Sequence, residues 1–258
     1  MSESAKVAQT PGATAAERTP ARARREAVLD ERKRAFLRMA SHELRTPLNS
    51  ILGFSEIIAA ELYGPLGAPQ YREYAAIIRS SGQRLLKLVN EILEIARLEG
   101  HAIGLDVAPE LLDHALDDVL DGLNEDIIAR GTQIHIIDRG SLPAVATDPR
   151  GLRTVLTHLI QNAVSFSPDG AQVRIRATVS HGGVDVFIMD DGPGADPADL
   201  PRLLRPFEQG DTALTRRSEG AGLGLPICQL LCQAMGGRLQ LRSAPGQGFT
   251  AHFRLPAA

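Results

Sequence analysis

The strongest constraint on the fold lies between about Arg25 and Glu99, where apolar residues recur at three- and four-residue spacing in two long runs. The stretch Tyr63–Pro69, rich in glycine and proline, separates the two runs. It predicts the end of a first helix, and a second helix then begins near Gln70 and ends at Glu99 and Gly100. The apolar positions are Leu37, Ala40, Leu44, Leu48, Ile51, Ile58 and Leu62 in the first run, and Tyr74, Ile78, Leu85, Leu88, Ile92 and Ile95 in the second. A two-helix hairpin cannot cover its own apolar stripe, so we expect a homodimer that completes a four-helix bundle.

The polar face of the first run carries the sequence His42-Glu43-Leu44-Arg45-Thr46-Pro47. Arg38 and Arg45 lie about one turn to either side of His42 on a helix, where their charges would attract a phosphate. Pro47 removes a backbone donor and crowds the carbonyl of Glu43, at a cost of roughly 3 kcal/mol, which predicts a bend beside His42. For an isolated His-Glu pair, the commoner meaning is an exposed histidine before a tolerated proline. The rest of the chain reverses that preference.

The composition excludes several classes of function. The formal net charge of -3 gives no global basic field, and the chain has no Trp, 7 Phe and 3 Tyr, so nucleic acid is not expected as the principal partner. No apolar run approaches the ~20 residues of a membrane helix and no signal-peptide core follows Met1, so we expect a cytoplasmic protein without a membrane span. Cys228 and Cys232 lie in an apolar run without a nearby His or Cys partner, which favours core packing over zinc binding.

The chain is expected to have three parts. Residues 1–25 lack hydrophobic periodicity and are expected to be a disordered tail. Residues 26–99 form the helical hairpin, and residues 100–258 alternate between strand and helix patterns. The second domain is predicted to be an α/β sandwich rather than a doubly wound fold, because its last strands form hairpins without intervening helices. The expected strands are Gly104–Ala108, Gln133–Asp138, Val145–Thr147, Gln172–Val179, Val184–Met189, Arg238–Ser243 and Thr250–Leu255, and the expected helices are Glu110–Ala129, Pro149–Phe166 and Gly222–Met235.

Three short clusters in this second domain have modest signals of their own. Asn162, on an amphipathic helix, offers a neutral oxygen suited to Mg²⁺. Asp190 follows an apolar strand, where a carboxylate can accept a hydrogen bond from an exocyclic amine, and Gly192 and Gly194 would let the backbone approach a flat ligand closely. The third cluster, Gly246-Gln247-Gly248, is by itself only a turn before the last strand.

A fourth cluster, Gly220-Ala221-Gly222-Leu223-Gly224-Leu225, is a glycine-rich loop that leads into a helix. The free amide groups at the start of that helix favour a polyphosphate. Arg216 and Arg217 precede the loop in the polar segment Gln209–Gly220, which is long enough to act as a lid. The loop is not a dinucleotide fingerprint, because its third glycine comes one residue too early, and it lacks the Lys-Ser/Thr ending of a P-loop.

Taken in order, these motifs resemble those of a sensor histidine kinase, and the resemblance covers nearly everything from about Arg25 to the C-terminus. It implies a dimerisation and phosphoacceptor hairpin (HisKA) followed by a catalytic α/β sandwich (HATPase_c) of the histidine kinase and Hsp90-like ATPase type. The boxes are His42–Pro47, then Asn162, then Asp190-Gly192-Gly194, then Pro206-Phe207-Glu208-Gln209, then Gly220–Leu225, then Gly246 and Gly248. The sequences Gly53-Phe54-Ser55-Glu56 and Tyr63-Gly64-Pro65 are most similar to the alphaproteobacterial cell-cycle subgroup, the PleC-like kinases.

The resemblance implies ATP and Mg²⁺ as cofactors and the receiver domain of a response regulator as the partner. His42 would take the γ-phosphoryl group of ATP and pass it to a receiver aspartate, while Glu43 accepts the proton of the imidazole. Thr46 would orient the water that removes phosphate from the receiver, giving a second, phosphatase activity. Asp190 would hold the adenine amine and Asn162 the Mg²⁺. The implied nucleotide-binding residues are Asn162, Asp190, Gly192, Gly194, Arg216, Arg217, Gly220, Gly222, Leu223 and Gly224, with the phosphates on the amides of Gly222 and Gly224.

Two positions depart from the family pattern. His158 stands where the family usually has asparagine, and Ser165 stands where it usually has a lysine, an arginine or a similar residue. Loss of a cation facing the γ-phosphate would slow transfer, because charged contacts of this kind contribute ~1.5–3 kcal/mol, although Arg216 or Arg217 could substitute from the lid. The departures leave a rival hypothesis open, a catalytically weak or phosphatase-biased scaffold that binds a receiver domain. A second rival, a conformational ATPase like the chaperone and mismatch-repair relatives, would have no use for the His42 box.

Overall fold

The computed structural model describes residue 46 and residues 48–68, 70–99, 104–208 and 221–258. The expected tail, residues 1–25, lies outside the described residues. So do His42 and Glu43 of the phosphoacceptor box, and Arg216, Arg217 and Gly220 of the lid and loop.

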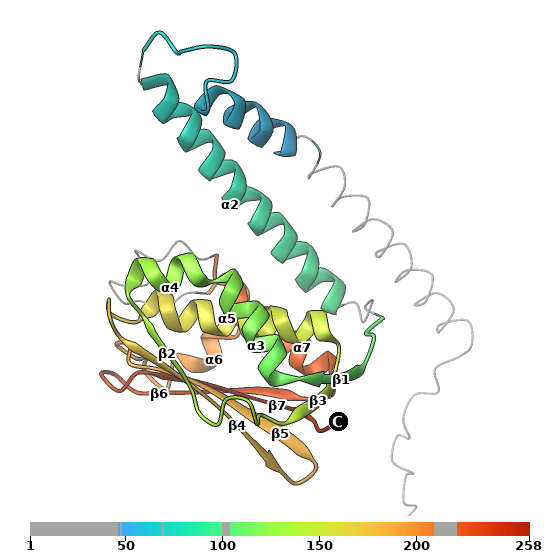
Figure 1. Ribbon diagram of the computed structural model, residues 1–258. Coiled ribbons are helices and arrows are strands. Elements are labelled where there is room, and N and C mark those ends of the chain that lie inside the picture. Colours follow the sequence, from blue (N-terminus) through green and yellow to red (C-terminus); the bar gives the residue numbers. More distant parts are fainter. Residues whose placement is uncertain (1–45, 47, 69, 100–103, 209–220) are drawn as a thin grey trace, which may run out of the picture.

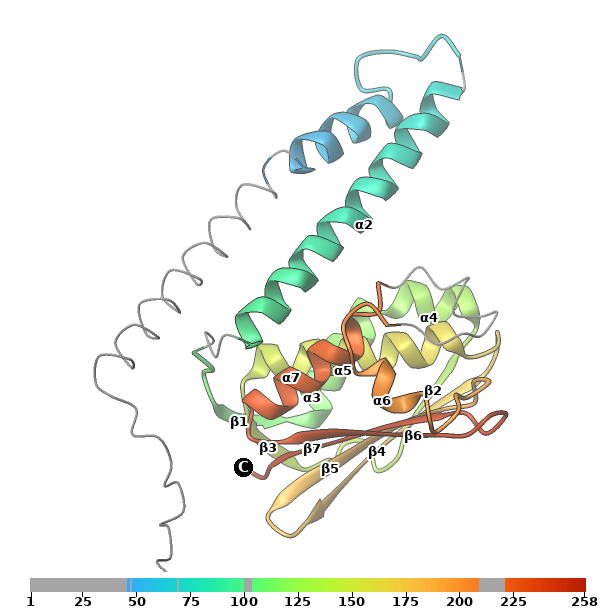
Figure 2. The same ribbon diagram turned by 180° about the vertical axis from the view of Figure 1, so that it is seen from behind.

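The N-terminal domain is a helical hairpin, as predicted. Its first helix is described from Thr46 to Ala59, with Pro47 outside the description, and it lies beside α2 (Gln70–Glu99) in Figures 1 and 2. Close packing of the two helices depends on Gly82 in α2, because a Cβ there would lie 3.0 Å from the Leu52 side chain of the first helix.

The first helix ends earlier than expected, so that Leu62 belongs to a turn and not to the helix. Glu61 takes a left-handed conformation with φ 52, which cannot continue a right-handed helix. Its carboxylate accepts a hydrogen bond from the Leu66 amide at 3.3 Å and pairs with Arg72 of α2 at 2.6 Å. These contacts fix the loop that the glycines and prolines predicted. Within the described residues, no helix is both long enough and apolar enough to cross a bilayer.

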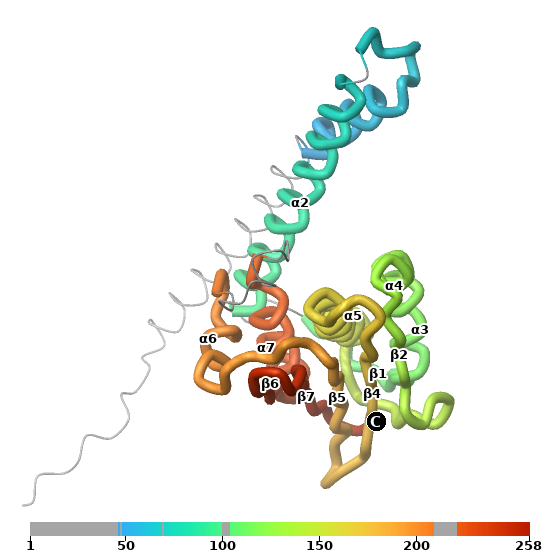
Figure 3. The backbone as a smooth tube through the Cα atoms, turned by 90° about the vertical axis from the view of Figure 1, so that its left-hand side faces the viewer, coloured from blue at the N-terminus to red at the C-terminus, as the bar shows by residue number. Residues whose placement is uncertain are grey.

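The second domain has two layers, as Figure 3 shows from the side. One layer is a five-stranded sheet in the order β2-β4-β5-β7-β6, in which only the β2–β4 pair is parallel. Helices α3, α5 and α7 cover one face of it, and β1 and β3 form a small separate antiparallel sheet. The expected α/β sandwich is therefore confirmed. The elements are β1 (Ala108–Leu111), α3 (Leu112–Gly122), α4 (Asn124–Arg130), β2 (Gln133–Ile136), β3 (Ala144–Thr147), α5 (Pro149–Phe166), β4 (Gln172–Ser180), β5 (Gly183–Asp190), α6 (Leu200–Leu203), α7 (Gly224–Ala234), β6 (Arg238–Ser243) and β7 (Phe249–Pro256).

Two expected elements of this domain were wrong in their bounds, and one short helix was not expected at all. The first strand of this domain lies at Ala108–Leu111 and not at Gly104–Ala108, because it is the later segment that pairs with β3. The single helix expected over Glu110–Ala129 is two helices, since the Leu123 amide donates to both Val119 and Leu120 and the chain turns there. The short helix α6 was not expected, because its four residues are too few to show an apolar repeat.

The core lies between the helical layer and the sheet. Helix α5 begins where Asp148 caps it, its carboxylate accepting a hydrogen bond from the Gly151 amide at 2.7 Å. Helix α7 packs against α5, and its Cys228 and Cys232 are fully buried free thiols, in accord with the predicted core packing. Burial raises the pKa of Cys232 to about 12, so this thiol stays protonated and unreactive at neutral pH.

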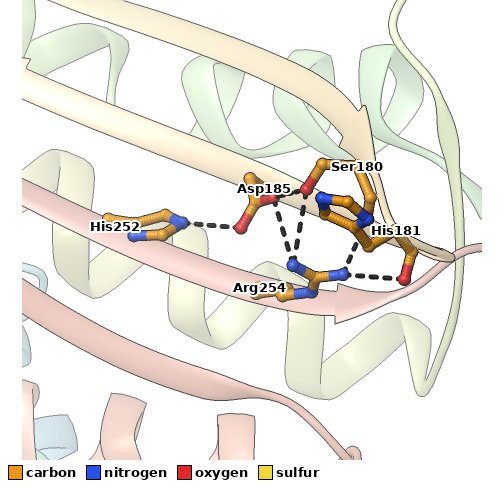
Figure 4. A network of polar contacts seen from close by, with 5 residues as sticks. All are labelled: Ser180, His181, Asp185, His252 and Arg254. Atoms are coloured by element: carbon orange, nitrogen blue, oxygen red, sulfur yellow. Dashed lines mark hydrogen bonds and ion pairs between the residues drawn. The ribbon is translucent and has the colours of Figure 1, made fainter.

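The face of the sheet opposite the helices carries a polar network, shown in Figure 4. Asp185 on β5 accepts hydrogen bonds from Ser180 and from His252, the latter at 2.8 Å, and pairs with Arg254 of β7 at 3.6 Å. Burial by itself would raise the pKa of Asp185. The bonds from Ser180 and His252 and the charge of Arg254 outweigh it, so the pKa is lowered from 3.8.

We expect Asp185→Asn to lower the Tm at pH 7 by roughly 3–10 °C, since a charged hydrogen bond contributes ~1.5–3 kcal/mol. A carboxylate whose pKa is lowered by folding stabilises the fold at pH values above its pKa in the unfolded chain. This contribution is lost as the pH falls through the pKa of the folded state. The variant should therefore lose less Tm than the wild type between pH 7 and pH 3. Asp117→Asn, which breaks the exposed pair with Arg139, is the control and should change the Tm little at either pH. An equal acid sensitivity of wild type and Asp185→Asn would contradict this role.

Candidate functional site

The candidate site is built around Asp190, the last residue of β5 and a neighbour of β7 in the sheet. Its side chain is buried, and its Oδ1 accepts hydrogen bonds from the amides of Gly192 at 2.8 Å and Phe249 at 3.2 Å. Burial raises the pKa of Asp190 to about 6, against the two amide bonds that lower it, and the neighbouring Asp191 adds to the rise. The two hydrogen bonds therefore fix the direction of the carboxylate, and burial shields it from solvent. Both properties suit a carboxylate that accepts a hydrogen bond from an amine of a ligand.

The glycines of the Asp190 box allow the backbone to close around this carboxylate. A Cβ on Gly192 would lie 2.8 Å from Asp190 Oδ1. Gly194 has φ 68, and a Cβ there would lie 2.1 Å from the carbonyl oxygen of Ala244. Both positions exclude a side chain because other parts of this chain pack closely against them. The expected close approach of a flat ligand to Gly192 and Gly194 stays a prediction.

The described end of the glycine-rich loop leads into the N-terminus of α7. Leu223 precedes this helix with no side-chain cap, and its own side chain is buried in the core, so only its backbone can face a ligand. Gly222 packs against the Pro206–Glu208 box, with its carbonyl accepting from the Phe207 amide at 3.2 Å. Gly224 begins the helix. Uncapped amides at the start of an 11-residue helix attract an anion.

Asn162 lies on α5, half-buried, one turn after His158. In the part of the chain that the structure describes, no cluster of three His, Cys, Asp or Glu side chains could hold a metal ion. The side-chain amide oxygen of Asn162 suits a magnesium ion that takes its other ligands from phosphates and water. Mg²⁺ is commonly held at a nucleotide in this way.

His158 links this site to the N-terminal domain, a connection that the sequence did not reveal. Its ring packs against the start of α7, since a Cβ on Gly224 would lie 3.2 Å from His158 Nδ1. Burial, and then the charge of Lys87, lowers the pKa of His158 to about 4, so the ring is neutral at pH 7. A groove of about 400 Å³ separates α2 from α5 at this point, lined by Gln83, Leu86, Lys87, Asn90, Glu91, Glu94 and His158.

The structure thus brings together Asp190, Gly192 and Gly194 at the end of β5, and Gly222, Leu223 and Gly224 beside His158 at the start of α7. Thr46 lies apart from them in the first helix, exposed. The residues that sequence reasoning missed are Phe249, whose amide holds Asp190, and Lys87. The box at Gly246 and Gly248 pointed to the first of these, and no motif pointed to the second.

Two family descriptions match the chain, in the order that its motifs predicted. The "His Kinase A (phospho-acceptor) domain" matches residues 32–101. The "Histidine kinase-, DNA gyrase B-, and HSP90-like ATPase" matches residues 147–258.

Three similar proteins come from the alphaproteobacteria Caulobacter vibrioides and Brucella suis. The chain is 38% identical over 228 residues to the "Non-motile and phage-resistance protein" of Caulobacter vibrioides, covering 87% of this chain and 27% of that protein. It is 38% identical over 225 residues to the histidine protein kinase DivJ of Caulobacter vibrioides, with coverage of 86% and 37%. It is 33% identical over 244 residues to the cell-division control histidine kinase PdhS of Brucella suis, with coverage of 91% and 24%. The chain thus spans 24% to 37% of the length of these relatives, and the expected likeness to the cell-cycle subgroup is confirmed.

Solved structures agree with the fold. Full-length ShkA, crystallised in complex with AMPPNP, superposes with a TM-score of 0.74 and 34% sequence identity, covering 87% of this chain and 46% of that one. The histidine kinase AdeS of Acinetobacter baumannii superposes with a TM-score of 0.57 and 21% identity, covering 84% of this chain and 98% of that one, which supports the fold alone.

Proposed function

Since the chain belongs to the histidine kinases, with a phospho-acceptor domain followed by the ATPase domain of that family, we propose that it phosphorylates itself on His42 with ATP and passes the phosphoryl group to a response regulator. The observation that carries the proposal is the buried, doubly hydrogen-bonded Asp190 at the end of β5, which lies near the C-terminal end of α5, while the N-terminus of α7, which has no side-chain cap, packs against His158 earlier on the same helix. Such a pair of sites fits the two ends of a nucleotide, an adenine amine and a polyphosphate.

The proposed reaction is a phosphoryl transfer between two nucleophiles. A ring nitrogen of His42 attacks the γ-phosphorus of ATP, the bond from phosphorus to the bridging oxygen of ADP breaks, and Glu43 accepts the proton from the other ring nitrogen. The phosphoryl group then moves from His42 to a carboxylate oxygen of the receiver aspartate. Asn162 would hold Mg²⁺, which neutralises phosphate charge when bound. The amides of Gly222 and Gly224 orient the phosphates, while Arg216 and Arg217 of the lid would add charge.

We also propose that the chain acts as a homodimer in the cytoplasm, where ATP and receiver domains are found. Support for the dimer comes from the apolar residues Tyr71, Ile78, Leu85 and Ile92 of α2, which recur every seven residues and are each 40% exposed or more. A seven-residue apolar repeat is the seam of a helical bundle. The division into residues 26–99 and 100–258, and a phosphatase activity that uses Thr46, belong to the same proposal.

The test is incubation of the full chain with γ-labelled ATP and Mg²⁺. We expect an acid-labile, alkali-stable label on the wild type, with loss of more than ~99% of it in His42→Ala, because no other described or expected group takes its place as nucleophile. The label should then pass to a receiver domain when one is added.

The same experiment separates the rivals. A wild type without label that still removes phosphate from a receiver in a Thr46-dependent way would support the phosphatase-biased scaffold and overturn the kinase. The relatives named above do not favour that scaffold. The chaperone-like ATPase is disfavoured by the match to a phospho-acceptor domain.

A further inference from the structure

Helix α2 packs against the catalytic domain with its C-terminal half. Ile95 and Leu98 belong to the same buried core cluster as α5 and α7, and Leu88 packs against that cluster. Figure 2 shows the lower end of α2 beside α7. The face of α2 that precedes these anchors lines the groove with His158, the residue that packs against the start of α7.

Lys87 is the cation on that face. Its Nζ lies 3.5 Å from Oε1 of Gln161, the residue next to Asn162, and its charge contributes to the lowered pKa of His158. The His158 ring in turn packs against Gly224 at the start of α7. Lys87, His158 and the first turn of α7 thus form one continuous surface.

The other charges around the groove are acidic. Glu91 lies one turn after Lys87, and Glu94 follows it. Burial raises the pKa of both carboxyls, while the charge of Lys87 opposes the rise at Glu91. Among the described residues that line the groove, Lys87 is the single positively charged side chain.

Helix α5 has no cation of its own near Asn162. Its two arginines stand in its first half, and Arg153 is engaged by Glu110 and Asp118, at 2.9 and 2.7 Å. Ser165, about one turn after Asn162 on this helix, contributes none. A terminal phosphate bound between Asn162 and α7 would therefore have no positively charged partner from α5.

We propose that Lys87 of α2 supplies this positive charge, contacting the terminal phosphate of ATP when α2 is packed on the catalytic domain. Lysine is suited to the task, because its ammonium is a compact charge with three donors on a flexible stem that can turn from Gln161 to a phosphate. The proposal rests on ATP binding at this site. It makes the preference for ATP over ADP depend on a residue of the dimerisation hairpin.

The experiment compares the Kd values of ATP and ADP, each with Mg²⁺, for the full chain by calorimetry. Lys87→Gln is expected to weaken ATP binding roughly tenfold or more and to leave ADP binding within about twofold, because only the terminal phosphate loses a partner. Arg79→Gln, about two turns before Lys87 on α2, where Arg79 pairs with Glu56 of the first helix, is the matched control and should leave both Kd values unchanged. Adding Ser165→Lys to Lys87→Gln should restore the preference for ATP, because it places a cation on α5 itself.

Equal losses of ATP and ADP in Lys87→Gln, or no loss of either, would overturn the role of Lys87. Failure of the underlying function has a different signature. In that case the wild type binds neither nucleotide, and Asp190→Asn changes nothing.

Discussion

Asp190→Asn is expected to weaken ATP binding by roughly 10- to 100-fold at pH 7.5, the effect of losing one charged hydrogen bond in a dry site. The carboxylate of Asp190 is buried and aimed by the amides of Gly192 and Phe249. An asparagine keeps the shape of the side chain and removes the charge that attracts an adenine amine. Equilibrium binding of ATP to the full chain measures the change.

We expect Asp190→Asn not to lower the stability of the fold. The pKa of Asp190 is raised by folding from 3.8 to about 6, so the folded state favours the protonated carboxyl. The resulting stabilisation is fully present below pH 3.8, the pKa in the unfolded chain, and is lost as the pH rises through 6. At pH 7 the ionised, buried carboxylate therefore destabilises the folded state. Asp190→Asn is expected to melt at the wild-type temperature or above, so weakened binding cannot be attributed to unfolding.

The same raised pKa gives the wild type a pH dependence. ATP affinity should be constant above pH 7 and fall as the carboxyl takes up a proton, by about tenfold per pH unit below 6. Asp191→Asn is the neighbouring control. Asp191 is exposed and pairs with Arg174 at 2.9 Å, and its charge raises the pKa of Asp190. Its removal should spare ATP binding at pH 7.5 and shift the midpoint to lower pH. A pH-independent affinity in the wild type would show that the carboxylate does not read the nucleotide.

The elements that could be predicted from sequence are those with strong local signals. Helix α5 has the predicted bounds because Asp148 and Pro149 mark its start and Ser167-Pro168 its end. Strand β6 also has its predicted bounds, set by Gly237 before it and the turn after Ser243. The Asp190 box was predictable for the same reason, since an acidic residue followed by glycines at the end of an apolar strand is a local pattern.

What could not be predicted depends on contacts between distant segments. The amide that holds Asp190 comes from Phe249, which is 59 residues further along the chain. The contact between Lys87 and Gln161 spans 74 residues and joins two domains. The division of the expected helix at Leu123 arises where the chain must turn to bring β2 beside β4, and nothing in the apolar spacing records it. Long-range pairing of this kind has no signature in a single sequence.

Gly248→Ala is expected to lower the Tm by roughly 4–15 °C and to weaken ATP binding along with it. Gly248 has φ 73, and a Cβ there would lie 2.0 Å from the carbonyl oxygen of Asp190. The left-handed backbone costs an alanine about 1–2 kcal/mol, and relief of the clash adds about 1–3 kcal/mol. Because the clash falls on Asp190 itself, the carboxylate must move with its backbone.

Gly246→Ala is a control from the same turn. Gly246 has φ 74, almost the same backbone conformation, and a Cβ there would meet nothing within 4 Å. It carries the backbone cost without the clash, so its Tm should fall by about 2–6 °C and its ATP affinity should stay at the wild-type value. Thermal melting and ATP titration of the two variants side by side isolate the contact between Gly248 and Asp190. If both variants lose the same Tm and neither loses affinity, the close approach of Gly248 to the Asp190 backbone does not position the carboxylate, and the amides of Gly192 and Phe249 are enough to set its direction.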